Sequence, residues 1–142
     1  MNQPIEQSSP ERVELRVPCR AEWVALARLA AATAANRLRF SLEEIEDVKL
    51  AVAEACAAAI QHDAHGEFIE LTCEALGDSL RIRLRDSGRQ GLHAADHRMN
   101  FEEARVAGLG IFLIRTLMDE VRYDVHPQNG TDLIMVKRST GA

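Results

Sequence analysis

The sequence predicts a two-layer α/β sandwich in which helices cover one face of a mixed, mainly antiparallel sheet. Two hairpin turn signals, Gly77-Asp78 and Asn129-Gly130, each stand between segments whose apolar residues alternate with polar ones. Two segments with helical spacing precede the first hairpin, and one precedes the second. Because hairpins join antiparallel neighbours and each strand pattern has one apolar side, we expect the helices to pack on that side.

Length and composition indicate one domain with an aliphatic core. The chain has 142 residues, of which 46% are hydrophobic and only 4% are aromatic, and domains are commonly about 100–150 residues long. Residues 1–10 are polar and contain two prolines, so we expect them to form a flexible N-terminus. Residues 11–142 are expected to form the single domain.

Charge, cysteines and hydropathy exclude several classes of partner. The net charge of −5 argues against direct nucleic-acid binding, because such surfaces are basic. Cys19, Cys56 and Cys73 form no metal-binding spacing, and without a signal peptide they fit a reducing cytoplasm. No apolar run approaches the ~20 residues that span a bilayer, so no membrane partner is expected.

The first half of the chain carries clear element signals. Apolar residues alternate with polar ones over residues 13–17, which predicts a strand that ends at a proline. Residues 21–38 are rich in alanine and have helical spacing. Ser41 is the expected N-cap of a second helix that runs to about His62, with Glu44 closing a capping box.

The second half predicts four strands, one helix and one long loop. The strands and the helix are expected at residues 69–75, 80–84, 110–118, 121–125 and 133–136. Residues 87–108 show no period apart from a possible helical turn near Phe101–Arg105. A loop of this length in a compact domain is usually functional or mobile.

Glu54 is the first candidate for chemistry. The apolar stripe of its helix centres on Val48 and Val52, and Glu54 lies on the opposite side with Ala51 and Ala58. One interpretation is a solvated glutamate on an exposed face. The other is an acid or base beside a ligand, which the small alanines allow to lie close to the helix backbone. Periodicity alone leaves both open.

Asp86 is the second candidate, because it continues the two-residue phase of the apolar residues Leu80, Ile82 and Leu84. Either the inward face of this strand ends in a carboxylate, which needs a partner, or the strand has ended and Asp86 begins a turn. A ligand with a hydrogen-bond donor, such as an adenine amino group, would satisfy an inward Asp86.

Gly108-Leu109-Gly110 stands at the start of a helix, where backbone N–H groups can approach a phosphate. Arg105 could add charge-assisted bonds to such a phosphate, or it could be a solvated loop residue. A glycine pair before a helix is also common in ordinary turns. Thr131, next to the second hairpin turn, reads equally well as an ordinary strand residue.

Together these motifs resemble the GHKL ATPases, and in particular their anti-sigma-factor serine kinase branch, the RsbW type. Residues 46–62 are similar to the N-box helix of that family, and Leu84-Arg85-Asp86-Ser87-Gly88 is similar to its first glycine box. Residues 108–121 resemble the second glycine box, and Gly130-Thr131 resembles the last. Four motifs in the family's order, across roughly residues 11–138, are far more specific than any one of them.

The resemblance implies a Bergerat-type ATP-binding fold with an adenine pocket and a catalytic general base. It implies that Glu54 is the general base that activates a serine hydroxyl. Asp86 is expected to contact the adenine amine, while Gly88 allows close approach to the base of the nucleotide. Thr131 is expected to support Asp86 through water.

ATP and Mg²⁺ are the cofactors that the resemblance implies. Gly108-Leu109-Gly110 is expected to cradle the phosphates with help from Arg105, and residues 89–107 to form the lid over ATP. The family's magnesium-holding asparagine is replaced by Ala58, which has no oxygen to offer a hard cation. We therefore assign no metal ligand. Gln90 also stands where a second glycine is usual.

The function implied is that of a cytoplasmic, homodimeric anti-sigma factor that regulates transcription in a stress response. Such a protein sequesters an alternative sigma factor and uses ATP to phosphorylate a serine of a STAS-type anti-sigma-factor antagonist. The alternative is a catalytically degenerate relative that binds sigma factor or antagonist without phosphoryl transfer. Ala58 favours this alternative, and the intact Glu54 argues against it.

Overall fold

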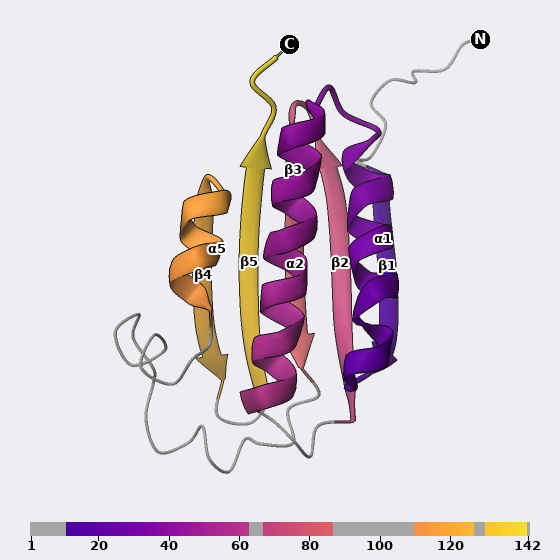
Figure 1. Ribbon diagram of the computed structural model, residues 1–142, viewed down its shortest axis with the longest axis vertical. Coiled ribbons are helices and arrows are strands. Elements are labelled where there is room, and N and C mark those ends of the chain that lie inside the picture. The colour runs from indigo at the N-terminus through magenta and orange to yellow at the C-terminus, as the bar shows by residue number, and fades with distance from the viewer. Residues whose placement is uncertain (1–10, 63–66, 87–109, 127–129, 142) are drawn as a thin grey trace, which may run out of the picture.

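The computed structural model describes residues 11–62, 67–86, 110–126 and 130–141, and the described strands form one five-stranded sheet (Figure 1). The strands are β1 (Glu11–Pro18), β2 (Phe68–Leu76), β3 (Ser79–Asp86), β4 (Glu120–His126) and β5 (Gly130–Arg138). The helices are a 3₁₀ turn η1 (Ala21–Trp23), α1 (Val24–Ala35), α2 (Leu42–His62) and α5 (Ile111–Leu117). The expectations for residues 1–10, 87–108 and 127–129 lie outside the described residues.

The helices α1, α2 and α5 lie on one face of the sheet (Figure 1), which confirms the predicted two-layer sandwich. The strand order is β1-β2-β3-β5-β4, and α2 lies over its centre. Every pairing among the described strands is antiparallel, so the parallel pair that a mixed sheet requires is absent from this part of the chain. The hairpin of β4 and β5 docks with β5 beside β3, which also makes the central pairing antiparallel.

The core lies between the sheet and the helices. Alternate residues of β2 and β3 are buried on the helix side, as the two-residue period predicts. Burial of each large aliphatic side chain contributes about 1.5–3 kcal/mol. On α2 the expected stripe is buried at its centre, while Ile45 and Ala59 at its margins are half-buried. The buried members of the three elements are Ile69, Leu71, Cys73, Leu80, Ile82, Leu84, Val48, Val52, Ala55 and Cys56.

The helix predicted over residues 21–38 is shorter than expected at both ends. It begins as the 3₁₀ turn η1, and α1 ends at Ala35. The amides of Arg37 and Leu38 donate to carbonyls three residues back, which tightens the last turn before the chain enters the next helix. None of the described helices is long and apolar enough to cross a membrane.

The predicted capping box at the start of α2 is present. The Ser41 amide donates to Glu44 Oε1 at 2.8 Å, and the Glu44 amide donates to Ser41 Oγ at 3.0 Å. The second carboxylate oxygen of Glu44 accepts from the Thr140 amide at 3.1 Å, so the same side chain also holds the C-terminal segment. These backbone donors, the Ser41 amide foremost, lower the pKa of Glu44. Glu44 therefore joins α2 to the chain beyond β5.

Replacing Glu44 with Ala should lower the free energy of unfolding by about 1–2 kcal/mol at pH 7, because two amides lose their acceptor. The folded-state pKa of Glu44 is lowered, so its contribution is complete above the unfolded carboxyl pKa of about 4.3 and is lost as pH falls through the folded value. Urea unfolding at pH 7 and in acid measures both effects. Glu43→Ala is the control, since Glu43 is exposed in the same helical turn. Equal losses for both variants, or a Glu44 effect independent of pH, would contradict this account.

Candidate functional site

The predicted motifs converge toward one end of the molecule, the lower half in Figure 1. The C-terminal half of α2, the end of β3, the start of α5 and the start of β5 all lie there. The antiparallel topology causes this, because β3 runs toward that end and β5 starts from it. The start of β1 and the end of β5 lie at the opposite end. Sequence motifs that are far apart in the chain are therefore close in space.

Glu54 faces Gly110, the residue that precedes α5. Gly110 has φ 70° and ψ 11°, a left-handed conformation that glycine adopts without steric cost. A Cβ atom at residue 110 would lie 2.7 Å from Oε1 of Glu54 and 3.7 Å from both its Cβ and its Cδ. The Glu54 carboxylate therefore lies directly against the backbone where α5 begins.

The α2 face that carries Glu54 is only partly exposed, although Gln61 near its end is exposed. Ala51, on the same face, is fully buried, and Glu54 and Ala58 are half-buried. Helical periodicity identified one apolar stripe on α2 and placed this face opposite to it. The sandwich packs α5 against α2, and Glu54 and Asp47 on this side meet Gly110 and Lys137.

A partly buried lysine holds the other end of α5 against the same face of α2. Lys137 Nζ of β5 donates to the carbonyl of Leu117, the last residue of α5, at 2.6 Å. The same ammonium group donates to Asp47 Oδ2 of α2 at 3.3 Å, with only 13% of the lysine side chain exposed. A cation at a helix C-terminus is favourable for the helix dipole. Sequence analysis missed Lys137, which lies just beyond the strand predicted over residues 133–136.

Asp86 ends β3 on the helix side of the sheet. It shares the two-residue phase of the buried aliphatic residues of this strand, and β3 extends through it, opposite Ile69 of β2. Only 5% of Asp86 is exposed. The interpretation of Asp86 as an inward carboxylate is therefore confirmed, and its interpretation as the start of a turn is wrong. Thr131 directly precedes Asp132 in β5. Asp132 pairs with Arg85, the residue before Asp86 in β3.

Asp132, a second buried carboxylate, was not predicted from the sequence. It lies in β5 with 4% exposure, and both of its oxygens accept from Arg83, at 3.1 and 3.0 Å. Arg85 Nε lies 3.1 Å from Asp132 Oδ1. The hydrogen bonds from Arg83 to Asp132 raise the pKa of Arg83. The alternating arginines of β3 were the sequence signal, because such a row on one sheet face calls for carboxylates on the neighbouring strand.

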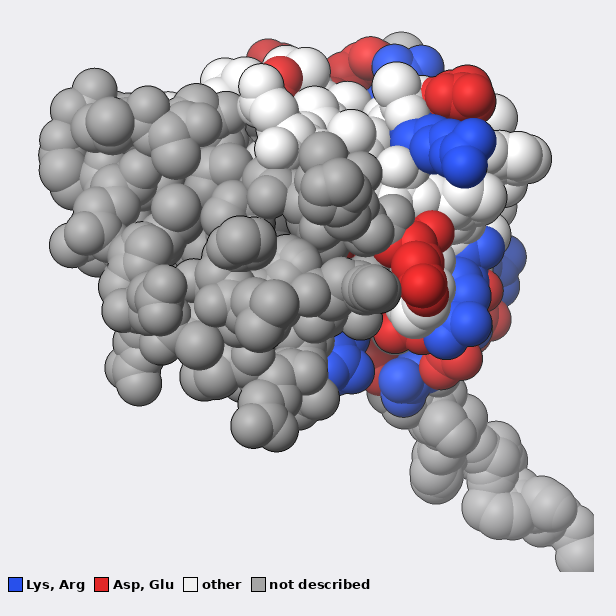
Figure 2. All heavy atoms as spheres, turned by 90° about the horizontal axis from the view of Figure 1, so that it is seen from below, with Lys and Arg blue, Asp and Glu red and all other residues white. Residues whose placement is uncertain are grey.

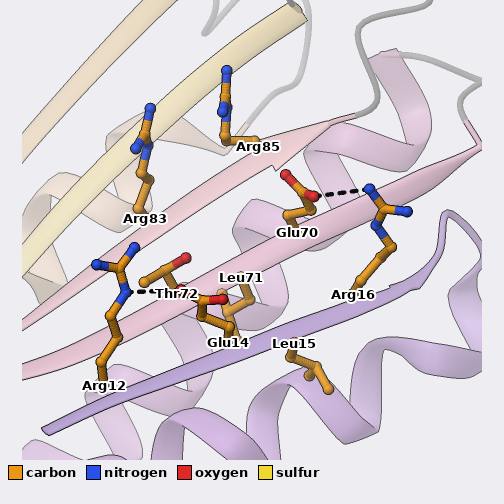
Figure 3. A pocket seen from close by; sticks show the side chains of 9 residues that line it. All are labelled: Arg12, Glu14, Leu15, Arg16, Glu70, Leu71, Thr72, Arg83 and Arg85. Atoms are coloured by element: carbon orange, nitrogen blue, oxygen red, sulfur yellow. Dashed lines mark hydrogen bonds and ion pairs between the residues drawn. The ribbon is translucent and has the colours of Figure 1, made fainter.

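The helix-free face of the sheet carries a shallow hollow of about 460 Å³ (Figure 3). Its charged side chains form ion pairs: Arg12 Nε lies 2.9 Å from Glu14, and Arg16 Nη2 lies 3.1 Å from Glu70. Arg83 and Arg85 pair with Asp132. None of the site residues predicted from the sequence lines it. We therefore regard this hollow as part of a surface ion-pair network, separate from the candidate site.

The remaining predicted site residues, Gly88, Arg105, Gly108 and Leu109, lie outside the described residues together with the expected lid at 89–107. Seen from the site end (Figure 2), the described basic side chains lie next to acidic ones, and this part of the surface has no patch of a single sign. Within the described ranges no group of three or more His, Cys, Asp or Glu side chains could hold a metal ion.

The residues that are present do not fit a magnesium site on α2. Glu54 offers one carboxylate, and the position one turn later is the half-buried Ala58, which has no donor atom. Mg²⁺ demands near-octahedral oxygen coordination and usually takes one or two carboxylates from the protein. Asp86 is buried on the helix side at the end of β3, and the Glu54 carboxylate lies beside a glycine backbone.

Comparison with known families decides what kind of domain this is. The model of the histidine kinase-like ATPase domain matches residues 17–137, which is most of the chain and includes α2, β3, α5 and β5. The chain belongs to this family. The four motifs and the two-layer fold of a histidine kinase-like ATPase domain are thus found together.

Individual relatives within this family carry the name serine-protein kinase RsbW. The relative from Halalkalibacterium halodurans is 35% identical over 137 residues, covering 90% of this chain and 83% of its own length. The relative from Listeria monocytogenes serovar 1/2a is 36% identical over 138 residues, covering 89% and 87%. The relative from Bacillus subtilis strain 168 is 32% identical over 147 residues, covering 95% and 90%. The resemblance to the RsbW type is therefore confirmed.

Replacing Lys137 with Met should lower the free energy of unfolding by about 1–3 kcal/mol, because the Leu117 carbonyl and Asp47 both lose a mostly buried donor. Urea unfolding measures the loss. Lys49→Met is the matched control: Lys49 pairs with the exposed Glu46 at 3.0 Å, and such a surface pair contributes about 0–1 kcal/mol. If both methionine variants unfold at the same urea concentration, Lys137 does not hold α5.

Proposed function

We propose that this protein is an anti-sigma factor with ATP-dependent serine kinase activity toward a STAS-type anti-sigma-factor antagonist. The observation that carries the proposal is the half-buried Glu54 carboxylate held against Gly110, at the end of the molecule where Asp86 is buried. The relatives named serine-protein kinase RsbW, which match this chain along most of its length, support the same reaction.

ATP binding is proposed to use the helix side of the sheet around Asp86. The Asp86 carboxylate accepts a hydrogen bond from the adenine amine, and Thr131 of the adjacent strand supports Asp86 through water. Burial strengthens this bond, because a carboxylate removed from bulk water is destabilised unless a well-aligned donor reaches it. Gly88 leaves room for the adenine ring. On the phosphate side, Gly108-Leu109-Gly110 and Arg105 are the proposed contacts.

Glu54 is the proposed general base of the transfer. The γ-phosphoryl group of ATP moves to the serine oxygen of the antagonist and leaves ADP, while the serine proton goes to the Glu54 carboxylate. A positioned base of this kind contributes about 10²–10⁴-fold to the rate. Half-burial between α2 and α5 limits the orientations of the carboxylate, as the reaction geometry requires.

Magnesium plays no assigned part in these steps. Family members of this kind use the metal to neutralise phosphate charge, but Ala58 offers no ligand. This observation favours a second candidate function, in which the protein captures a sigma factor or an antagonist without phosphoryl transfer. In either case the proposed cellular role is regulation of transcription in a stress response, by a cytoplasmic homodimer that sequesters an alternative sigma factor.

Asp86→Asn should weaken ATP binding at least tenfold, because the amide replaces one acceptor oxygen with a donor that opposes the adenine amine. Calorimetric titration with ATP, with and without magnesium, measures the affinity of both proteins. Asp124→Asn is the control for charge, since Asp124 is a partly exposed β4 residue that pairs with Arg122 at 3.5 Å. Wild-type affinity in the Asp86 variant would place adenine elsewhere, and an affinity indifferent to magnesium would favour the second function.

Glu54→Gln should leave ATP affinity within a fewfold of wild type and slow phosphoryl transfer by about 10²–10⁴-fold, because the neutral amide cannot accept the serine proton. Transfer of radiolabelled phosphate from ATP to the antagonist that co-purifies with the protein is the measurement. Unchanged transfer would show that Glu54 is not the base. A wild-type protein that holds the antagonist but transfers no phosphate would establish the second function.

A further inference from the structure

We infer that Gly110 is a positioning residue for Glu54: the absence of a side chain at residue 110 sets where the Glu54 carboxylate lies. The inference rests on the proposed role of Glu54 as the base, and it assigns Gly110 a task apart from approaching phosphate. Glycine at residue 110 thus meets two separate requirements. One is the left-handed backbone, and the other is the space that the carboxylate occupies.

The contact is specific to Glu54. The three atoms nearest to a Cβ at residue 110 all belong to the Glu54 side chain, and the first, Oε1, is only 2.7 Å away. Carbon and oxygen atoms that are not bonded do not approach that closely, so one of them must move. The other two atoms, at 3.7 Å, are in ordinary contact. A methyl group at residue 110 therefore displaces the carboxylate and leaves the stem of the side chain nearly in place.

The helix cannot retreat in place of the carboxylate. Ile111 and Ile114 of α5 are buried in the core, and the amide of Ile114 donates to the carbonyl of Gly110 at 3.1 Å. At the other end of α5, Lys137 holds the Leu117 carbonyl. Glu54 Oε1, in contrast, is the end of a flexible side chain. The Glu54 carboxylate, which is the proposed base, is therefore the group that moves.

Gly77 provides a matched control for the backbone. It has φ 63° in the turn between β2 and β3, close to the 70° of Gly110, and a Cβ there would have no atom of the described residues within 4 Å. Gly77→Ala therefore carries the same kind of left-handed strain without any contact. Comparison of Gly110→Ala with Gly77→Ala therefore removes the effect of backbone strain, and the rescue by Glu54→Asp separates the contact with Glu54 from the proposed phosphate contact of Gly110.

The kinetic test compares these two variants in transfer of phosphate from ATP to the co-purifying antagonist. Gly110→Ala should lower kcat by about 10–10²-fold with little change in KM for the antagonist, because a base displaced by about 1 Å loses its alignment. Gly77→Ala should stay within twofold of wild type. Adding Glu54→Asp to Gly110→Ala withdraws the carboxylate by one methylene group, so the kcat of the double variant should be at least threefold higher than that of Gly110→Ala. Glu54→Asp alone should be slower than wild type. Equal rates for the two alanine variants, or no rescue, overturn the inference.

A second measurement does not depend on kinase activity. The ¹³C resonance of the Glu54 side-chain carboxyl, assigned by its loss in Glu54→Gln, should move in Gly110→Ala and stay in place in Gly77→Ala. If it moves while the wild-type protein transfers no phosphate, Gly110 positions Glu54 but the proposed kinase function fails. If the wild-type protein is an active kinase and the resonance is unchanged in Gly110→Ala, the kinase function stands and the positioning role is overturned.

Discussion

The contact between α2 and α5 is the constraint on which the candidate site depends. At one end of α5, the backbone of Gly110 lies against the Glu54 carboxylate, and at the other end Lys137 joins the Leu117 carbonyl to Asp47. Ala51, one turn before residue 55 on α2, is fully buried. The same packing that completes the helix layer therefore also restricts the side chain proposed as the base. Stability and chemistry share one interface.

The buried carboxylates on the two faces of the sheet have different surroundings. Asp132 lies on the helix-free face, where Arg83 and Arg85 surround it and offset the cost of its burial. Asp86 lies close by in the neighbouring strand but belongs to the apolar helix side. The two-residue period of a strand thus decides which aspartate joins an ion-pair network and which one faces the layer proposed for nucleotide. A slip of one residue in β3 would move Asp86 to the helix-free face.

Local rules predicted much of this fold, because the signals act over a few residues. The capping box of Ser41 and Glu44 is one example, and the Gly77 turn is another. The surroundings of Glu54 could not be predicted in this way. Periodicity identifies one buried stripe on a helix. A helix that packs against both a sheet and a neighbouring helix has two buried stripes, and on α2 the stripe toward α5 carries alanine and paired charges. Lys137 and Asp132 were missed for the same reason, since their partners are distant in the sequence.

The position of Glu54 and the identity of residue 58 are physically separate matters. The atoms that a Cβ at residue 110 would meet belong to Glu54, and Ala58 lies one turn further along α2. The close approach of Glu54 to Gly110 therefore does not require an oxygen donor at residue 58, where the resemblance leads us to expect a cation ligand. A chain can in this way keep a well-placed base while its metal site is incomplete. This separation explains how an intact Glu54 and Ala58 are compatible within one histidine kinase-like ATPase domain.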